Sequence, residues 1–597
     1  MPTPLESVQA LLPAAEARPV PPWFPDWARE FTDQYFSGTT CLFLLHGNVH
    51  DLVRLGGGQD GPFGGLPEFL TTQLFGTWDV VLRYDLSHGL RPYAGADGER
   101  LRKMVATLEA RAGEPTTWPR DPDAVLALID RLVQQEVMEA DPHRRIGLGV
   151  IVEHVQYIVP SAELSQMTGT QGSRLVRLLS WAQNPYIKRH NIAFCLLVDR
   201  LAEVNERLVG SAHVASIAVP MPDVAARESY ATWYDGRDGT LGNLTDFTPR
   251  LLAELTSGLN LVNLERLLAH AAQARQKLDG RVLKRLKKDL IERQTRGLVE
   301  FVEPSHTLDD FVGNDAVKGR LIDDANLLAK GRLDAAPMGY LISGPVGTGK
   351  TYLAECFAGS VGIPCVKLRN FRSKYVGETE GNLEQVLTVL RAMGPVVVVI
   401  DEADAALGTR EAQGDSGTSS RVFSMIAGQM GDTRYRGKLI WLLLTSRPDL
   451  LPVDLKRQGR AEVHLPLFAP RGDAEVRQMI EVMARKNKTD LAPDAIPDGV
   501  AARGLSGADL ESIVLSAKRR ALIEGRETLA RSDLERALDD FIPSAQGLEK
   551  EKQELAAVLE CTSMSFLPDD WRSRVAEPDG RAKLQERMAT IRRLIED

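Results

Sequence analysis

The sequence is poor in features that mark several large classes of protein. Its 597 residues contain five cysteines and no CxxC pair, which argues against a disulfide framework or a zinc site and favours a reducing compartment. The longest apolar runs, such as Val396–Ile400 and Leu439–Leu444, are far shorter than the roughly 20 residues of a membrane span. Residues 1–27 contain prolines and acids but no long apolar core, so they do not resemble a signal peptide. We therefore expect a cytoplasmic protein with no membrane span.

The sequence also lacks an excess of basic residues. Its formal net charge is -9 and its pI is about 5.7, so nucleic acid is not an expected partner. One segment, Arg275–Arg296, is basic with apolar residues at helical spacing, and it fits a solvated helix face better than a nucleic-acid patch. With 43% hydrophobic and 26% charged residues, the chain has the composition of a globular protein. Its length suggests about three to five structural units.

A glycine-rich loop stands in the second half of the chain. Residues 338–351 read MGYLISGPVGTGKT, where an apolar run leads into a G-x-x-x-x-G-K-T pattern, and a helix-like stretch follows. This order of strand, loop and helix is the context that a phosphate-binding loop requires. Glycines let backbone N–H groups approach phosphates, Lys350 can reach the β- and γ-phosphates, and the Thr351 hydroxyl can bind Mg²⁺. The predicted nucleotide-binding residues of this loop are Gly344, Pro345, Val346, Gly347, Thr348, Gly349, Lys350, Thr351 and Tyr352.

A second motif supplies acidic groups. Residues 396–404 read VVVVIDEAD, and such a β-branched run predicts a strand buried on both faces. At the end of this strand, Asp401 can hold Mg²⁺ and Glu402 can polarise the attacking water. An isolated Asp-Glu pair would suggest only an acidic turn that caps a strand. Here the segment after the phosphate loop is long enough for the helices and strand of a doubly wound sheet, so the two motifs together predict Mg-dependent hydrolysis of a nucleoside triphosphate.

Residues 307–543, which contain both motifs, resemble the AAA ATPases, the group that includes valosin-containing protein, katanin, spastin and FtsH. Several unrelated segments appear in the family's order, so the resemblance is specific. It implies that the nucleotide is ATP and that Val312 and Gly313 lie beside adenine. It also implies a homohexameric ring in which Tyr375 and Val376, in SKYVGETE, face the pore and grip a polypeptide substrate. No HExxH motif occurs, so the zinc protease of FtsH-like enzymes is not expected.

Two positions depart from the family's pattern. In LIWLLLTSRPDLL, Ser446 stands where the sensor residue is usually Asn, and its shorter side chain would hold the attacking water less well. In KRQGRAEV, Arg460 matches the first arginine finger, which would touch the γ-phosphate bound by the neighbouring subunit, but Val463 stands at the second finger position. The resemblance also places Gly507 and Ala508 near the base and ribose. The predicted catalytic residues are Lys350, Glu402, Ser446 and Arg460.

The first half of the chain resembles a decayed copy of the second. Segment 258–271 mirrors segment 504–517, and segment 191–222 mirrors segment 437–466, at a nearly constant offset. Two unrelated α/β domains with similar strand endings are the alternative. In FLLHGNVHDLV the first half lacks the second Gly, the Lys and the Thr of a phosphate loop, and Val152 stands where the metal-binding Asp is needed. We expect this half to have no nucleotide chemistry and to serve as a ring scaffold or a partner-docking surface.

These observations predict an α/β fold of the P-loop NTPase class, a doubly wound parallel sheet with a small helical lid, present twice with the first copy degenerate. The predicted units are a Pro-rich N-terminal segment (1–27), a degenerate AAA-like α/β domain (28–235) and its helical lid (236–300), followed by an active ATPase α/β domain (301–470), its lid (471–543) and a helical C-terminal extension (544–597).

Two functions fit this organisation. The first is an ATP-hydrolysing ring that remodels, unfolds or disassembles protein substrates through a central pore, as Tyr375, Val376 and Arg460 indicate. The second is a nucleotide-dependent assembly or adaptor protein that never threads a chain, which the missing second finger, Ser446 and the degenerate first copy favour. The sequence leaves open the substrate, the ring size and the role of the C-terminal extension.

Overall fold

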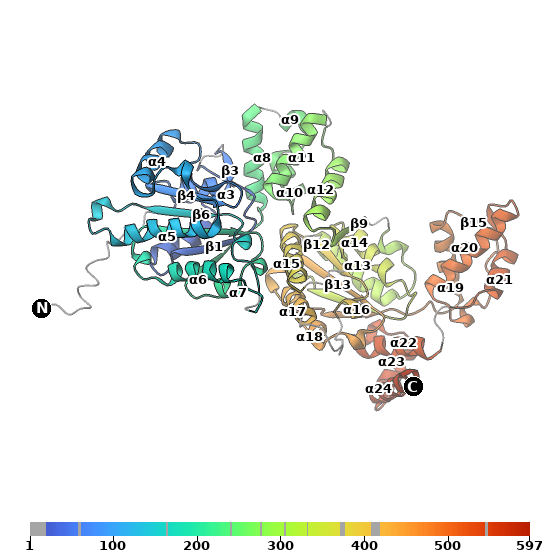
Figure 1. The fold of residues 1–597 in the computed structure, drawn as a ribbon. Coiled ribbons are helices and arrows are strands. Elements are labelled where there is room, and N and C mark those ends of the chain that lie inside the picture. The colour runs from blue at the N-terminus through green and yellow to red at the C-terminus, as the bar shows by residue number, and fades with distance from the viewer. Residues whose placement is uncertain are drawn as a thin grey trace. The chain divides into compact units, whose positions relative to one another are not determined.

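The computed structural model describes residues 20–57, 61–162, 165–238, 241–274, 277–303, 306–330, 332–369, 376–407, 418–543 and 547–596. The chain divides into two compact units, Met1–Ile291 with Glu380–Ala392, and Glu292–Thr379 with Met393–Asp597. Each unit is built around one six-stranded sheet (Figure 1). Within the described ranges, no helix combines the length and the apolar character needed to cross a bilayer.

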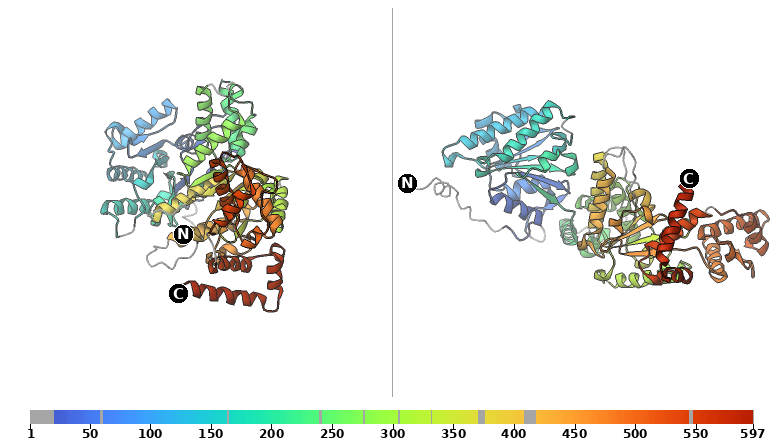
Figure 2. Two further views of the ribbon diagram at one scale, coloured as in Figure 1. Left: turned by 90° about the vertical axis from the view of Figure 1, so that its right-hand side faces the viewer. Right: turned by 90° about the horizontal axis from the view of Figure 1, so that it is seen from below.

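The sheet of the first unit is parallel except at one edge. Its strand order is β5-β4-β6-β7-β1-β8, and β5 pairs with β4 in the antiparallel direction. Every residue of β7 is buried, because helices cover both faces of the sheet, as is usual for parallel sheets (Figure 2). The bounds are β1 (Leu42–Gly47), β4 (Val80–Asp85), β5 (Gly89–Pro92), β6 (Leu148–Val152), β7 (Ile192–Val198) and β8 (Val214–Val219).

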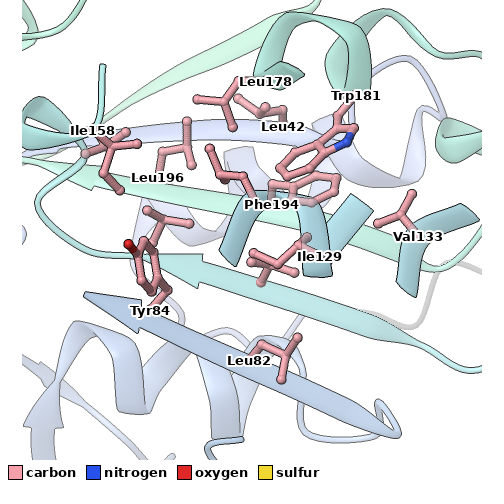
Figure 3. Packing of buried hydrophobic residues seen from close by; sticks show 14 of the residues in the cluster. Leu42, Leu82, Tyr84, Ile129, Val133, Ile158, Leu178, Trp181, Phe194 and Leu196 are labelled. Atoms are coloured by element: carbon pink, nitrogen blue, oxygen red, sulfur yellow. The ribbon is translucent and has the colours of Figure 1, made fainter. Parts of the chain in front are cut away.

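Alternation along β1 places its side chains in two separate cores. Leu42 belongs to one buried cluster, whereas Phe43 belongs to the cluster on the other face, as the two-residue period of a strand requires. In the first cluster the Trp181 ring stacks on Phe194, with centroids 4.7 Å apart (Figure 3). The Trp181 indole N–H donates to Asp130 at 2.7 Å, so this large side chain is buried without losing its hydrogen bond.

Local sequence signals set the helices of the first unit. The side chain of Asp121 accepts backbone N–H groups at the start of α5, where Pro122 occupies the first position. Thr168 and Gln171 form a capping box at the start of α6. The elements around the sheet are α2 (Asp26–Phe36), β2 (Leu52–Arg54), β3 (Phe63–Gly65), α3 (Leu66–Phe69), α4 (Gly98–Ala112), α5 (Pro122–Met138), α6 (Gly169–Gln183) and α7 (Glu206–Val209).

A helical group follows the first sheet and is drawn in green in Figure 1. Within this group α8 packs against α10, and the guanidinium of buried Arg227 donates to the carbonyl of Ala253 at 2.9 Å. The bounds of this group are α8 (Val224–Asp238), α9 (Leu241–Leu244), α10 (Pro249–Leu255), α11 (Leu261–Ala274) and α12 (Gly280–Gln294).

The sheet of the second unit has the order β14-β10-β13-β12-β11-β9, and only β9 is antiparallel to its neighbour. The strands are β9 (Val299–Val302), β10 (Gly339–Ser343), β11 (Cys365–Leu368), β12 (Val396–Ile400), β13 (Leu439–Thr445) and β14 (Val463–Pro466). The helices among them are α13 (Asp315–Ala329), α14 (Lys350–Val361), α15 (Val376–Ala392), which continues into the segment grouped with the first unit, α16 (Ala403–Leu407), α17 (Thr418–Met430) and α18 (Val453–Lys456).

Two helical groups complete the second unit. The lid has its own core, in which Ile480, Leu510 and Leu534 come from three different helices. The C-terminal extension has another core, and its α22 and α24 lie side by side (Figure 2). The lid contains α19 (Asp473–Lys486), β15 (Asp490–Leu491), α20 (Gly507–Ile523), β16 (Thr528–Leu529) and α21 (Arg531–Asp539), and the extension contains α22 (Leu548–Glu560), α23 (Asp569–Ala576) and α24 (Gly580–Glu596).

The two sheets share one topology, which confirms the repeat predicted from the sequence. Strands β8, β1, β7, β6 and β4 follow one another in space as β14, β10, β13, β12 and β11 do in the second sheet. The sheets differ at the edge, where β5 follows β4 in a hairpin but β9 precedes all other strands of its sheet. A parallel sheet fixes each strand through its crossover helices, whereas an antiparallel edge strand can be added from either side in the chain.

Three predicted boundaries need correction, because they fall inside helices or strands, and the boundary after residue 235 lies 11 residues past the start of its helix. The boundary after residue 27 cuts α2, which begins at Asp26. The boundary after residue 235 cuts α8, which begins at Val224, and the boundary after residue 300 cuts β9, which begins at Val299. Pattern and composition locate a domain in the chain, but helix caps and strand pairing decide the residue at which it ends.

Candidate nucleotide-binding site

A cavity of 560 Å³ opens at the carboxyl ends of β10, β12 and β13. This edge is where open α/β sheets bind ligands, and the volume lies within the range of small-molecule sites. The lid contributes walls from α19 and α20. The predicted site residues that line the cavity are Val312, Val346, Gly347, Thr348, Gly349, Lys350, Thr351, Tyr352, Asp401, Glu402, Ser446, Gly507 and Ala508.

The phosphate loop wraps the first turn of α14. Gly349 precedes this helix with a φ of 85°, a left-handed conformation that glycine adopts without strain. At Gly344 a Cβ would lie 2.2 Å from the carbonyl oxygen of Leu467, so only glycine lets the loop pass beside β14. The first residues of α14, Lys350 and Thr351, line the cavity, and the N-terminus of a helix is a favourable place for phosphate.

Lys350 folds back onto the loop that carries it. Its ammonium donates to the carbonyls of Gly344 at 2.8 Å and Pro345 at 2.9 Å. Burial lowers the pKa of Lys350 to about 8, and the charges of Asp401 and Asp404 oppose this shift. A buried ammonium held by neutral carbonyls is only partly compensated, so a phosphate oxygen would be a stronger partner for it.

Asp401 and Thr351 meet at the end of β12. The Thr351 hydroxyl donates to Asp401 Oδ2 at 3.3 Å, and the ammonium of Lys367 donates to the same oxygen at 2.7 Å. A hydroxyl and a carboxylate oxygen side by side are the hard oxygen donors that Mg²⁺ prefers. The Asp401 carboxylate already pairs with a cation, Lys367, so this pair of oxygens fits a bound Mg²⁺.

Glu402 lies beside Asp401 in a conformation that few non-glycine residues adopt. Its φ is 48°, and its backbone N–H donates to Asp401 Oδ1 at 3.0 Å. Non-glycine residues with positive φ are uncommon and cluster at functional sites. The turn places both acidic residues on the cavity wall.

Two further polar residues line this end of the cavity, and the motif analysis did not identify them. The Thr445 hydroxyl donates to Asp404 Oδ1 at 2.6 Å, and the backbone N–H of Arg447 donates to the Thr445 hydroxyl at 2.8 Å. This chain of bonds fixes the turn after β13 that carries Ser446. Both residues could have been identified from the sequence, because Asp404 is the last residue of the VVVVIDEAD motif and Thr445 directly precedes Ser446.

Apolar and aromatic side chains on the cavity wall could hold a planar base. Phe311 and Tyr352 stack with centroids 6.3 Å apart, and both line the cavity together with Met479 and Met483 of α19. Methionine adapts its shape to flat aromatic partners. The lid reaches the phosphate loop here, because the N–H of Ala508 donates to the carbonyl of Gly347 at 3.1 Å.

Several predicted residues do not line the cavity. Gly344 and Pro345 belong to the loop but do not line the cavity, and their carbonyls accept hydrogen bonds from Lys350. Gly313 faces α19 instead, since a Cβ added to it would collide with the Glu475 carboxylate. Tyr375 lies outside the described residues, as does the side chain of Val376, whose backbone begins α15.

Arg460 also lies away from the cavity. It donates through Nη1 to the carbonyl of Asp454 at 2.9 Å, and the two side chains lie 3.6 Å apart. Its Nε is buried and, among the described residues, has no hydrogen-bond acceptor. Arg460 is therefore not part of the cavity wall of its own chain.

The carboxyl edge of the first sheet carries different chemistry. The carboxylate of Asp51, which is 3% exposed, accepts the N–H groups of Leu261 at 3.1 Å and Val262 at 2.9 Å at the start of α11. Burial raises the pKa of Asp51, and these hydrogen bonds oppose the shift. In the second unit the corresponding place, between the loop and the lid helix, belongs to the cavity. A protein carboxylate thus caps the first helical group where a nucleotide would bind.

Two histidines, His50 and His154, lie at the same edge of the first sheet. His50 Nε2 lies 3.0 Å from Asp199 Oδ1, and this hydrogen bond raises the pKa of His50. The His50 ring stacks on His154 with centroids 4.9 Å apart. Val152 ends β6 as Ile400 ends β12, so the prediction that Val152 replaces the metal-binding Asp was wrong by one residue. Glu153 stands at the place of Asp401, and His154 stands at the place of Glu402 with a similar positive φ of 55°. Among the described residues of the first unit, neither a phosphate loop nor an Asp-Glu pair lies at this edge.

Replacement of Asp51 by alanine is expected to destabilise the first unit by about 1–3 kcal/mol, because two N–H groups of α11 lose a buried acceptor. Asp51→Asn keeps one acceptor oxygen and should cost less. Thermal unfolding followed by tryptophan fluorescence measures the effect, since most of the eight tryptophans lie in the first 291 residues. An unchanged melting temperature in Asp51→Ala would contradict the capping role.

Three family models match this chain. "AAA+ chaperone, N-terminal Rossmann-like domain" matches residues 13–220, and "AAA+ chaperone, second helical domain" matches residues 225–296. "ATPase family associated with various cellular activities (AAA)" matches residues 340–468. The chain belongs to the AAA family. In this AAA protein the first two matches cover the degenerate copy and its helical group, and the third covers the phosphate loop, the acidic strand and Arg460.

Curated relatives resemble part of the chain. This AAA protein is 34% identical over 235 residues to the ATP-dependent zinc metalloprotease FtsH 3 of Sphaerobacter thermophilus, which covers 38% of this chain and 47% of that protein. It is 33% identical over 190 residues to Protein SAV of Sulfolobus acidocaldarius, and 34% identical over 192 residues to Peroxisomal ATPase PEX6 of Kluyveromyces lactis. These last two matches each cover 31% of this chain, and 24% and 19% of the respective relatives. The matched region spans less than half of each relative.

Proposed function

We propose that this AAA protein hydrolyses ATP at the cavity of its second unit and uses Mg²⁺ in doing so. The observation that carries the proposal is the placement of Lys350, Thr351, Asp401 and Glu402 on the walls of one 560 Å³ cavity. A cation, two metal-binding oxygens and a second carboxylate are the set that phosphoryl transfer to water requires.

Each of these residues has a distinct role in the proposed reaction. Thr351 and Asp401 would hold Mg²⁺, which when bound neutralises charge on the β- and γ-phosphates. Lys350 would exchange its carbonyl partners for phosphate oxygens. Glu402 would accept a hydrogen bond from the attacking water and polarise it, and the Ser446 hydroxyl would help to orient that water. Val312, Gly507 and Ala508 would enclose the base and ribose.

We propose that hydrolysis drives the remodelling of protein substrates in a homohexameric ring. Support comes from the family, from the likeness to FtsH and PEX6 proteins, and from Arg460, which lies outside the cavity of its own chain. In this arrangement Arg460 completes the site of the next subunit, and Tyr375 and Val376 contact the substrate. The degenerate first copy would act as a scaffold for the ring or as a docking surface.

A second candidate is a nucleotide-dependent assembly or adaptor protein that does not thread a chain. Val463, where a second arginine finger is absent, and Ser446, with its short hydroxyl, favour this alternative. Both changes would slow hydrolysis and prolong the ATP-bound state. A slow cycle suits a switch better than a motor.

Purified protein is expected to release phosphate from ATP, and chelation of Mg²⁺ is expected to stop the release. Tyr375→Ala separates the two candidates, because it removes a pore contact without touching the described cavity. Retained ATPase with loss of unfolding of a fluorescent model substrate supports threading. Unchanged remodelling in Tyr375→Ala supports the assembly or adaptor protein. A wild type that neither binds nor hydrolyses ATP contradicts the proposed site.

A further inference from the structure

We infer that the C-terminal extension positions the phosphate loop, with Gln553 and Lys550 as the positioning residues; this rests on the proposed ATP site. The backbone N–H of Val346, in the phosphate loop, donates to Gln553 Oε1 at 3.0 Å. Gln553 lies on α22 and is only 7% exposed. Its amide nitrogen donates to Glu549 Oε1 at 3.4 Å, which leaves the amide oxygen directed at the loop.

The same helix also contacts the start of the lid. The Lys550 ammonium donates to the carbonyl of Gly504 at 2.7 Å. Gly504 precedes α20, whose Gly507 and Ala508 line the cavity. Residues three apart lie on one face of a helix, so Lys550 and Gln553 join the lid and the phosphate loop through a single surface of α22.

Contacts with the core of the second unit fix the position of this helix. Glu560 at the end of α22 pairs with Lys456 at 2.5 Å. Phe468, which follows β14, is buried in one cluster with Leu555 and Trp571. Arg592 of α24 donates to Asp449 at 3.0 Å. An anchored helix can impose a loop geometry, whereas a loosely held one would follow the loop.

The Val346 contact organises the loop before ATP arrives. In a phosphate loop the backbone N–H groups bind phosphate oxygens, but the N–H of Val346 already has an acceptor from the protein. This bond favours one conformation of the loop, and preorganisation lowers the cost of ordering on binding. A contact that contributes equally to the ground state and the transition state affects binding alone, so loss of this bond should weaken binding and leave the chemical step little changed.

The test compares Gln553→Met, Lys550→Met and Glu551→Gln in the full chain. Gln553→Met keeps the side-chain length and removes the acceptor, and Lys550→Met removes the exposed lid contact. Glu551→Gln is the matched control, because Glu551 pairs with Arg587 at 2.8 Å within the extension and does not line the cavity. Binding is measured with a fluorescent ATP analogue, turnover by phosphate release, and folding by thermal unfolding.

We expect Gln553→Met to raise Kd and KM by about 3- to 10-fold, the range for one net hydrogen bond, with kcat within about twofold of the wild type. Lys550→Met should raise KM in the same direction, and Glu551→Gln should change neither constant. Folded Gln553→Met and Lys550→Met proteins that bind ATP as the wild type does would overturn the inference. An equal rise in Kd and KM in Glu551→Gln would also overturn the inference. A wild type that binds no ATP would instead refute the proposed function.

Discussion

Replacement of Glu402 by glutamine is expected to lower kcat for ATP hydrolysis by about 10²–10⁴-fold, the usual contribution of a general base. Glutamine has nearly the same shape but cannot accept a proton from water. The backbone N–H of Glu402 bonds to Asp401, and substitution leaves that bond and the metal-binding oxygens in place. Nucleotide affinity should therefore stay near that of the wild type.

Phosphate release and binding of a fluorescent ATP analogue measure the two effects separately. Lys350→Ala provides the contrast, because the loss of the buried ammonium should abolish binding as well as turnover. The Glu402→Gln protein with ATP is also the form in which electron microscopy would best show the ring order and any chain in the pore. Wild-type turnover in Glu402→Gln would contradict the assignment of the base.

Removal of the Arg460 side chain is expected to lower kcat by about 10³–10⁵-fold, the range for arginine fingers in related phosphoryl transfers. Arg460 does not line its own cavity and is held by Asp454, so its effect should depend on assembly. The ATPase rate per subunit of the wild type should rise with protein concentration, because each site needs an arginine from the next subunit. Arg460→Ala should remove this dependence.

Arg457→Ala is the matched control for this experiment. Arg457 lies three residues away, pairs with the same Asp454 at 3.4 Å, and is 60% exposed. Exposed ion pairs contribute little, so this variant should keep most of the activity if Arg460 alone is the finger. If the wild-type ATPase rate is independent of protein concentration and Arg460→Ala has the same rate, the proposed action of Arg460 on the neighbouring subunit is wrong.

The tandem copies show how one topology can keep or lose a nucleotide site. Both sheets bring the same strand ends to one edge, yet the second presents Asp401 and Glu402 there and the first presents Glu153 and His154. In the first copy the Asp51 carboxylate accepts the N–H groups at the start of α11. This contact needs no ligand, which is compatible with the scaffold role proposed for the first copy.

The sequence by itself determined the fold class, the repeat and the residues of the phosphate loop and acidic strand. These depend on local patterns: glycine spacing, a β-branched run followed by Asp-Glu, and two segments repeated at a constant offset. Such patterns predict local structure because backbone conformation and burial act over a few residues. For the same reason the departures of Ser446 and Val463 from the family's pattern were visible in the sequence alone.

Only the tertiary structure decided which distant residues meet. The bond of Gln553 to Val346, the Asp51 cap on α11, and the Asp404–Thr445 pair join segments that no local pattern connects. The structure also placed Gly313 against Glu475 rather than in the cavity. Contacts of this kind depend on how helices and strands pack against one another. Sequences with the same hydrophobic pattern can pack in different ways, so only the folded structure shows which distant residues touch.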